Sequence, residues 1–139
     1  MGFPKNFLWG VATSAGQIEG GSSDDGRTPS IWDKFCALPG KTFNGDIPDT
    51  ACDSYHRFDE DLKNLKLLGV DSFRLSISWS RVLPHGTGKL NSKGVDYYKD
   101  VFDKLLDAGI LPNVTLYHWD LPQILEDKGG WVSRDSIEW

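Results

Sequence analysis

Two stretches of the chain, "LKLLGVDSFRLS" (residues 65–76) and "DKLLDAGILPNVTL" (residues 103–116), share one pattern that decides the fold. In each, leucine-rich residues lead to a glycine, and an apolar run follows. Gly69 and Gly109 are 40 residues apart (109 minus 69). A glycine just past the last periodic residue is typical of a helix end, because glycine adopts the left-handed conformation without strain. Each stretch therefore predicts a helix that ends at its glycine and leads into a buried strand.

Apolar residues recur at helical spacing before both glycines, and Asn91 or Ser92 can cap the start of the second helix. The periodic positions are Tyr55, Phe58, Leu62, Leu65 and Leu68 before the first glycine, and Val95, Tyr98, Phe102, Leu105 and Leu106 before the second. Buried strands are predicted at residues 7–15, 70–78 and 111–118. Alternating strands and helices predict an α/β fold in which right-handed crossovers join the strands of a parallel sheet.

Composition narrows the class of protein. The chain has 139 residues and a net charge of −5, with acidic and basic residues interspersed and no basic stripe, so no nucleic-acid partner is expected. No apolar run approaches the ~20 residues that span a bilayer, and no signal-like segment begins the chain; a soluble, cytoplasmic protein is the simplest expectation. Cys36 and Cys52 lack metal-site spacing, so free thiols in a reducing compartment are favoured over a disulfide or a metal site.

Residues 20–53 show little periodicity and predict a long loop after the first strand, with a short helical turn at "SIWDKF" (residues 30–35). Loops after strands build the binding site in α/β folds.

Near the other end of the chain, residues 122–128 predict a short helical piece, and Ser133 is predicted to be the N-cap of a new helix. A sheet of three parallel strands leaves its edges open and its faces half covered, so we expect something further to complete it.

The stretch "TSAGQIEGG" (residues 13–21) ends the first predicted strand. It matches neither G-x-G-x-x-G nor G-x-x-x-x-G-K-[ST], which argues against a phosphate site. The amide of Gln17 offers both a donor and an acceptor, which suits sugar hydroxyls. Glu19 could be a catalytic acid, but a structural carboxylate bonding the glycine-rich backbone of the following loop is favoured.

The second predicted strand contains "SFRLSISWS" (residues 72–80), in which Arg74 shares one face with serines, and Phe73 and Leu75 share the other. A buried guanidinium is costly unless it is paired, so Arg74 needs a carboxylate partner. The residues alone leave two alternatives open. Arg74 forms either a structural ion pair or a pair with a reactive carboxylate that it keeps ionised.

The third predicted strand runs into "LYHWDLPQ" (residues 116–123). His118 as a hydrogen-bond donor and Trp119 as a stacking wall would suit a polyhydroxylated ring, although a lone histidine near a strand is more often a satisfied core residue. A metal site is disfavoured because no second histidine lies at ligand spacing. Since parallel strands end at one edge of their sheet, we expect Gln17, Arg74, His118 and Trp119 to converge there.

Several motifs resemble glycoside hydrolase family 1, the β-glucosidase family. They occur in the family's order and cover essentially the whole chain: "FLWGVATSAGQIEGG" (7–21), "FRLSISWSRVLP" (73–84), "VTLYHWDLPQ" (114–123) and "DKGGW" (127–131). The resemblance implies a (β/α)8 TIM barrel of which residues 1–139 form the N-terminal part of a single catalytic domain. Only the first three β/α units would be present, with strands four to eight absent. The implied activity is retaining hydrolysis of terminal β-D-glycosidic bonds.

The resemblance also assigns roles. The residues matching Gln17, His118 and Trp119 contact the sugar, and the residue matching Arg74 hydrogen-bonds the nucleophilic glutamate. Retaining hydrolysis needs two carboxyl groups roughly 5–5.5 Å apart, and the family carries them in Asn-Glu-Pro and Glu-Asn-Gly motifs. Neither motif occurs here, so no catalytic residue is expected in this chain. It is expected to hydrolyse a β-glucoside only with a complementary polypeptide, and to need no metal or cofactor.

One departure from the family concerns Gly16, where the family usually has an aromatic or other sizeable residue. The loss of such a side chain would leave a hole behind Gln17 and loosen its rotamer. A weakened site is the first consequence to expect. It also keeps open the alternative that the chain belongs to a non-catalytic glycan-binding or partner-binding scaffold of the same fold.

Overall fold

A computed structural model describes residues 2–139, which contain a sheet of three parallel strands in the order β1-β2-β3. The strands are β1 (Gly10–Ala12), β2 (Ser72–Ser76) and β3 (Leu111–Thr115). All three predicted strands are present, but each is shorter than predicted. The prediction that they are buried holds only for β2, since every residue of β1 and three of the five residues of β3 are exposed. After β1 the backbone N–H of Thr13 bonds Arg74 O at 2.8 Å, and the chain then turns into a helix. The ends of the predicted strands therefore belong to the segments that flank β1, β2 and β3, including the first residue of α1.

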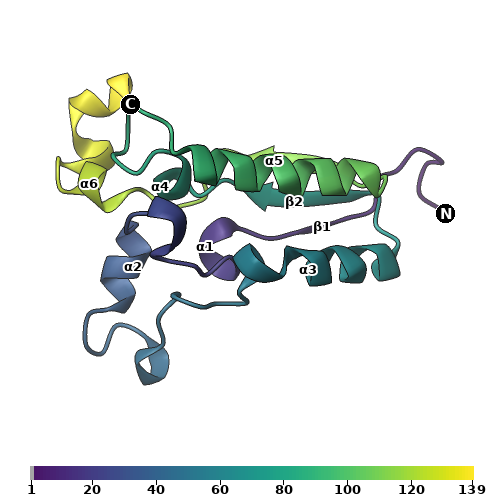
Figure 1. Ribbon diagram of the computed structural model, residues 1–139, viewed down its shortest axis with the longest axis horizontal. Helices are drawn as coiled ribbons and strands as arrows, with labels where there is room; N and C mark the ends of the chain where they lie inside the picture. Colours follow the sequence, from purple (N-terminus) through teal and green to yellow (C-terminus); the bar gives the residue numbers. More distant parts are fainter. Residues whose placement is uncertain (1) are drawn as a thin grey trace.

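Two long helices, α3 (Ser54–Leu68) and α5 (Ser92–Asp107), connect the strands and run alongside them (Figure 1). Both end as predicted, with Gly69 at φ +64° and Gly109 at φ +72°. Asn91 occupies the predicted N-cap position of α5, but its side chain does not cap the helix. Its amide donates instead to the carbonyl oxygens of Asp25 and Arg81, at 2.8 and 2.9 Å. Asn91 thus joins the long loop after β1 to the loop after β2.

The core lies between the two long helices and one face of the sheet. Phe73 and Leu75 of β2 point into it, as predicted, and the other members are Phe58, Leu65, Val101, Leu105 and Ile110. Two predicted core residues lie outside it, since Leu68 is 65% exposed and Leu106 is 57% exposed. Neighbouring helix residues point about 100° apart, so Leu106 cannot share the direction of Leu105. Leu68 borders an open hollow beside Val11 of β1.

No helix within residues 2–139 covers the other face of the sheet. The register aligns Ala12, Arg74 and Asn113 across the three strands, and these residues are exposed or half-buried. The outer strands β1 and β3 each pair on one side only within residues 2–139. A parallel sheet in a stable α/β protein is covered on both faces. This open face agrees with the prediction that the three strands need further structure to complete them.

Short helices gather at the end of the sheet where the strands finish (Figure 1). They are α1 (Ala15–Ile18), α2 (Ile31–Cys36), α4 (Trp79–Val82), α6 (Gln123–Glu126) and the 3₁₀ turns η1 (Asp24–Gly26), η2 (Phe43–Gly45), η3 (Gly130–Val132) and η4 (Arg134–Glu138). The predicted turn at residues 30–35 is α2, which begins with a capping box between Ser30 and Asp33. Ser133 caps η4, with its Oγ accepting the N–H of Asp135.

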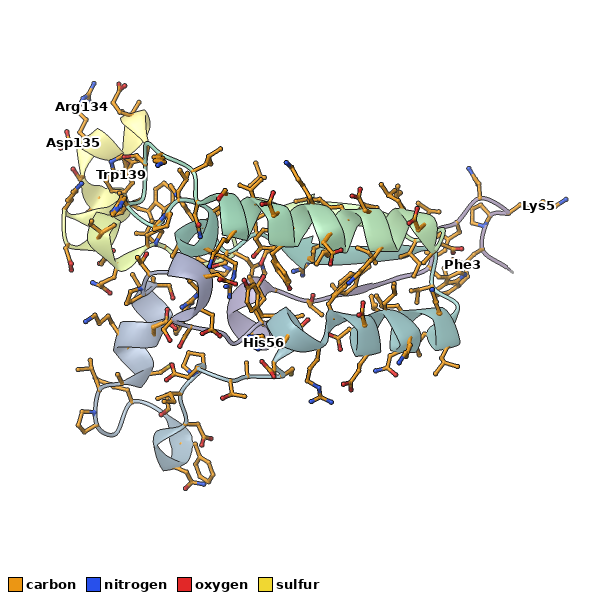
Figure 2. The ribbon with its side chains drawn as sticks, in the orientation of Figure 1. Phe3, Lys5, His56, Arg134, Asp135 and Trp139 are labelled. Atoms are coloured by element: carbon orange, nitrogen blue, oxygen red, sulfur yellow. The ribbon has the colours of Figure 1, made fainter. Side chains whose placement is uncertain are left out.

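The side chains near the two ends of the chain lie at opposite ends of the molecule. Figure 2 shows Arg134, Asp135 and Trp139 beyond the carboxyl ends of the strands, and Phe3 and Lys5 at the other end. Cys36 and Cys52 are free thiols, as predicted. No helix within residues 2–139 is both long and apolar enough to cross a bilayer.

Candidate functional site

A hollow of about 290 Å³ opens beyond the carboxyl ends of β1 and β3. It brings together three predicted site residues, Gln17, His118 and Trp119, although about 100 residues of sequence separate the first from the other two. The long loop after β1 supplies the rest of its wall. The complete lining is Ser14, Gly16, Gln17, Trp32, Cys36, Pro48, His118 and Trp119.

Gln17 was predicted to lie at the end of the first strand, but it lies on α1. The start of α1 is anchored to β2, because Ser76 Oγ accepts the backbone N–H of Ala15 at 2.7 Å. The side chain of Gln17 is exposed and hydrogen-bonds no other residue within 2–139. Its amide is therefore available to a ligand in the hollow, on a helical turn that is held at one end by the sheet.

His118 and Trp119 lie on a tight turn just after β3. Trp119 has a positive φ of +68°, and its side chain is 68% exposed. A left-handed backbone is a genuine outlier for a bulky residue, and such strain concentrates at ligand sites. The His118 ring is half-buried and hydrogen-bonds no described residue. The turn therefore presents an imidazole and a free indole face to the hollow.

Arg74 is half-buried on the uncovered face of β2 and does not line the hollow. Its Nη1 donates to the carbonyl oxygen of Thr13 on the neighbouring strand segment. Within residues 2–139 no carboxylate pairs with it, so both alternatives require a carboxylate partner from outside these residues. The guanidinium is held by one hydrogen bond to Thr13, the residue that follows β1, and retains donors for another partner.

Glu19 is a buried structural carboxylate, 5% exposed, and it does not line the hollow. It was predicted to bond the glycine-rich backbone directly, and this detail is wrong. Glu19 Oε2 accepts Arg81 Nε at 3.1 Å, and Arg81 Nη2 in turn donates to the carbonyls of Gly20 and Gly21. The backbone is thus held through Arg81, because its carbonyls need a donor that a carboxylate lacks.

Tyr98 of α5 completes this network. Its hydroxyl donates to Glu19 Oε1 and accepts the backbone N–H of Ser78 at 2.7 Å. Burial raises the pKa of Glu19, while the charge of Arg81 and the hydrogen bond from Tyr98 oppose the rise. The network joins α1, α4 and α5 at the end of the sheet that carries the hollow.

Gly16 borders the hollow directly, next to Gln17. Its φ is not positive, and a Cβ atom built there would meet one neighbour within 4 Å, the Cβ of Asp120 at 3.9 Å. A side chain at position 16 would therefore encounter little steric resistance at its first atom. The absence of such a side chain widens the hollow beside Gln17.

Comparison with known proteins identifies the family. A family model described as glycosyl hydrolase family 1 matches residues 1–139. The chain belongs to glycosyl hydrolase family 1. It is 56% identical to beta-glucosidase A of Acetivibrio thermocellus over 137 residues, which are 99% of this chain and 31% of that protein. Beta-glucosidase 34 of Oryza sativa is 52% identical over 97% of this chain and 27% of its own length.

A solved structure gives the same result for the fold. The family 1 β-glucosidase from Thermotoga maritima superposes with a TM-score of 0.96 at 52% identity, over 99% of this chain and 32% of that one. This family 1 chain therefore contains the first three β/α units of a (β/α)8 TIM barrel, as predicted. The chain spans about a third of the length of the relatives it matches.

Other residues of the hollow were missed by sequence reasoning. Trp32 and Cys36 of α2 and Pro48 of the following loop line it, yet none had been predicted as a site residue. The loop carries no periodicity that tells which of its side chains turn toward the strand ends. The one signal for these residues was that they follow the first strand, because loops that follow strands of a parallel sheet build the binding face.

Proposed function

We propose that residues 1–139 are the N-terminal part of the single barrel domain of a retaining β-glucosidase that hydrolyses terminal β-D-glycosidic bonds. The observation that carries the proposal is the meeting of Gln17, His118 and Trp119 in one hollow at the carboxyl ends of the strands, where barrel enzymes place their active sites. Two relatives that are 56% and 53% identical to this chain are named beta-glucosidase A.

In this proposal Gln17 and His118 hydrogen-bond sugar hydroxyls, and Trp119 stacks on the apolar face of the ring. Two features support these roles. Both polar side chains lack partners among residues 2–139, and Trp119 exposes 68% of its surface. Solved structures of the Thermotoga maritima β-glucosidase contain glucoimidazole or deoxynojirimycin, which makes a glucoside the expected class of substrate here.

The chemistry needs two carboxyl groups that lie outside residues 1–139. One attacks the anomeric carbon and forms a covalent glycosyl-enzyme while the other protonates the leaving oxygen; water then cleaves the intermediate. Arg74 would lie beside the nucleophilic carboxylate and keep it ionised. Its free donors and its place on the uncovered face of the sheet support this role. None of these steps calls for a metal ion or an organic cofactor.

A complementary polypeptide would supply the remaining strands of the barrel. The uncovered sheet face and the edges of β1 and β3 that are unpaired within residues 2–139 support the need for those further strands. The partner would pair its strands with these edges and bring the two glutamates to the same end of the barrel as the hollow.

The test combines the chain with a polypeptide that carries the other five strands and both glutamate motifs. Hydrolysis of a chromogenic aryl β-D-glucoside is expected from the combination and from neither part alone. A matched combination in which both glutamates are replaced by glutamine should bind deoxynojirimycin and release no aglycone.

Two results would reject the proposal in different ways. If the intact combination binds deoxynojirimycin but never hydrolyses the glucoside, the chain is a glycan-binding scaffold. If it neither binds nor hydrolyses, the hollow is not a sugar site.

A further inference from the structure

Asp120 has a buried carboxylate next to the hollow that has no part in the proposed chemistry. The residue is 2% exposed. Its Oδ1 accepts the backbone N–H of His118 at 3.4 Å, and its Oδ2 has no hydrogen-bond partner within residues 2–139. Burying a carboxylate oxygen without a partner costs stability. Groups that carry such a cost beside a pocket are often functional.

Asp120 adjoins all three segments that line the hollow. A Cβ atom at Gly16 would lie 3.9 Å from the Cβ of Asp120, so the residue packs against the turn that carries Gln17. It directly follows His118 and Trp119. The carbonyl of the next residue, Leu121, accepts the N–H of Ile31 at 2.9 Å. Asp120 is therefore attached to the start of α2, the helix that bears Trp32.

The conformation of Trp119 needs an external cause. Its φ of +68° is strained for a bulky residue, and such strain persists only where the surroundings over-determine it. Asp120 Oδ1 bonds the N–H of the residue before Trp119, so the hydrogen bond spans the strained residue. Without that acceptor, the turn could relax toward an ordinary conformation and carry the indole and imidazole away from the hollow.

We propose that Asp120 is a positioning residue for the sugar site, whose carboxylate holds Trp119 in its left-handed conformation and thereby orients His118 and Trp119 toward the ligand. This inference rests on the proposed function of the hollow. Burial raises the pKa of Asp120 to about 6, and the charged groups that act on it are Arg27, which lowers its pKa, and Asp33, which raises it. The carboxylate is therefore largely ionised at neutral pH and is a strong acceptor there.

The test compares Asp120→Asn with Asp120→Ala in the complete barrel. Asparagine retains an acceptor oxygen for the His118 N–H, whereas alanine removes it. Asp120→Ala is expected to raise KM for an aryl β-D-glucoside at least tenfold, and to weaken deoxynojirimycin binding by a similar factor, with a smaller change in kcat. Asp120→Asn is expected to stay within threefold of the parent in both measurements. Asp120→Leu, which matches the shape without the acceptor, replaces the alanine variant if that variant does not fold.

A double-mutant cycle separates positioning from general stability. In a Trp119→Gly background the left-handed turn costs no strain, so adding Asp120→Ala should change deoxynojirimycin binding less than twofold. If Asp120→Ala weakens binding equally in both backgrounds, or if Asp120→Asn is as defective as Asp120→Ala, the inference is wrong.

The two proposals fail in distinguishable ways. Parent-like KM and affinity in every Asp120 variant would reject the positioning role and leave the hydrolase intact. A parent barrel that binds deoxynojirimycin without hydrolysing glucosides would reject the hydrolase. The pattern of binding among the variants would still decide the role of Asp120.

Discussion

Replacement of Glu19 by alanine should destabilise the protein far more than the same replacement at Glu60. Both glutamates pair with an arginine, at 3.1 Å for Glu19 with Arg81 and at 2.6 Å for Glu60 with Arg57. They differ in burial, since the Arg81 side chain is 0% exposed while the Arg57 and Glu60 side chains are 54% and 56% exposed. Glu19→Ala leaves the Arg81 guanidinium unpaired where water cannot reach it. Glu60→Ala leaves the Arg57 guanidinium unpaired where it is already solvated.

The magnitude follows from the burial. Removal of one partner from a buried ion pair costs about 3–5 kcal/mol. The Nη1 atom of Arg81 already lacks a hydrogen-bond partner within residues 2–139, so the loss of Glu19 would add to the unsatisfied donors of a buried cation. With a urea m-value of about 2 kcal/mol per molar, a loss of about 4 kcal/mol lowers the unfolding midpoint by about 2 M. Glu60→Ala should leave the midpoint within experimental error, because exposed pairs contribute little.

The assay is urea unfolding followed by far-UV circular dichroism at pH 7. A third variant, Glu19→Ala with Arg81→Met, removes both charges and should recover part of the lost stability. If Glu19→Ala shifts the midpoint no more than Glu60→Ala does, the buried network does not carry the energy assigned to it. If the double variant is as unstable as the single one, the stranded charge is not the cause.

Four further predictions concern single positions. Arg74→Ala in the complete barrel should lower kcat by about two orders of magnitude through misplacement of the nucleophile; near-parent turnover would contradict its role. Gly16→Ala should raise the free energy of unfolding by about 0.5–1 kcal/mol, since its Cβ meets only an ordinary contact at 3.9 Å. Gly69→Ala should lower it by about 1–2 kcal/mol because φ is +64° there, and urea midpoints check both glycines. The hydrogen bond that the His56 ring Nδ1–H donates to the Asp53 carboxylate raises the pKa of His56 above 6.5. In Asp53→Asn the pKa measured by NMR titration of the His56 ring, which Figure 2 shows at the start of α3, should therefore move back toward 6.5.

Local pattern was sufficient for much of the architecture. Gly69 and Gly109 mark the helix ends because only glycine adopts their left-handed φ without cost, and this property needs no tertiary information. The alternation of Phe73 and Leu75 with Arg74 assigned the faces of β2 for a similar reason, since side chains of a strand alternate in direction. The convergence of Gln17 with His118 and Trp119 followed from the topology, because parallel strands end at one edge.

The sequence by itself thus determined the class of fold, the helix ends, the buried face of the sheet and three side chains of the proposed sugar site. Tertiary structure alone decided which charges meet, since Glu19 finds Arg81 and Tyr98, which lie 62 and 79 residues away. It also decided that one carboxylate oxygen of Asp120 is buried without a hydrogen-bond partner within residues 2–139, and that Trp32 of α2 lines the hollow. The physical reason is that helix caps and strand alternation are properties of neighbouring residues, whereas burial and pairing depend on segments that become neighbours only in the folded chain.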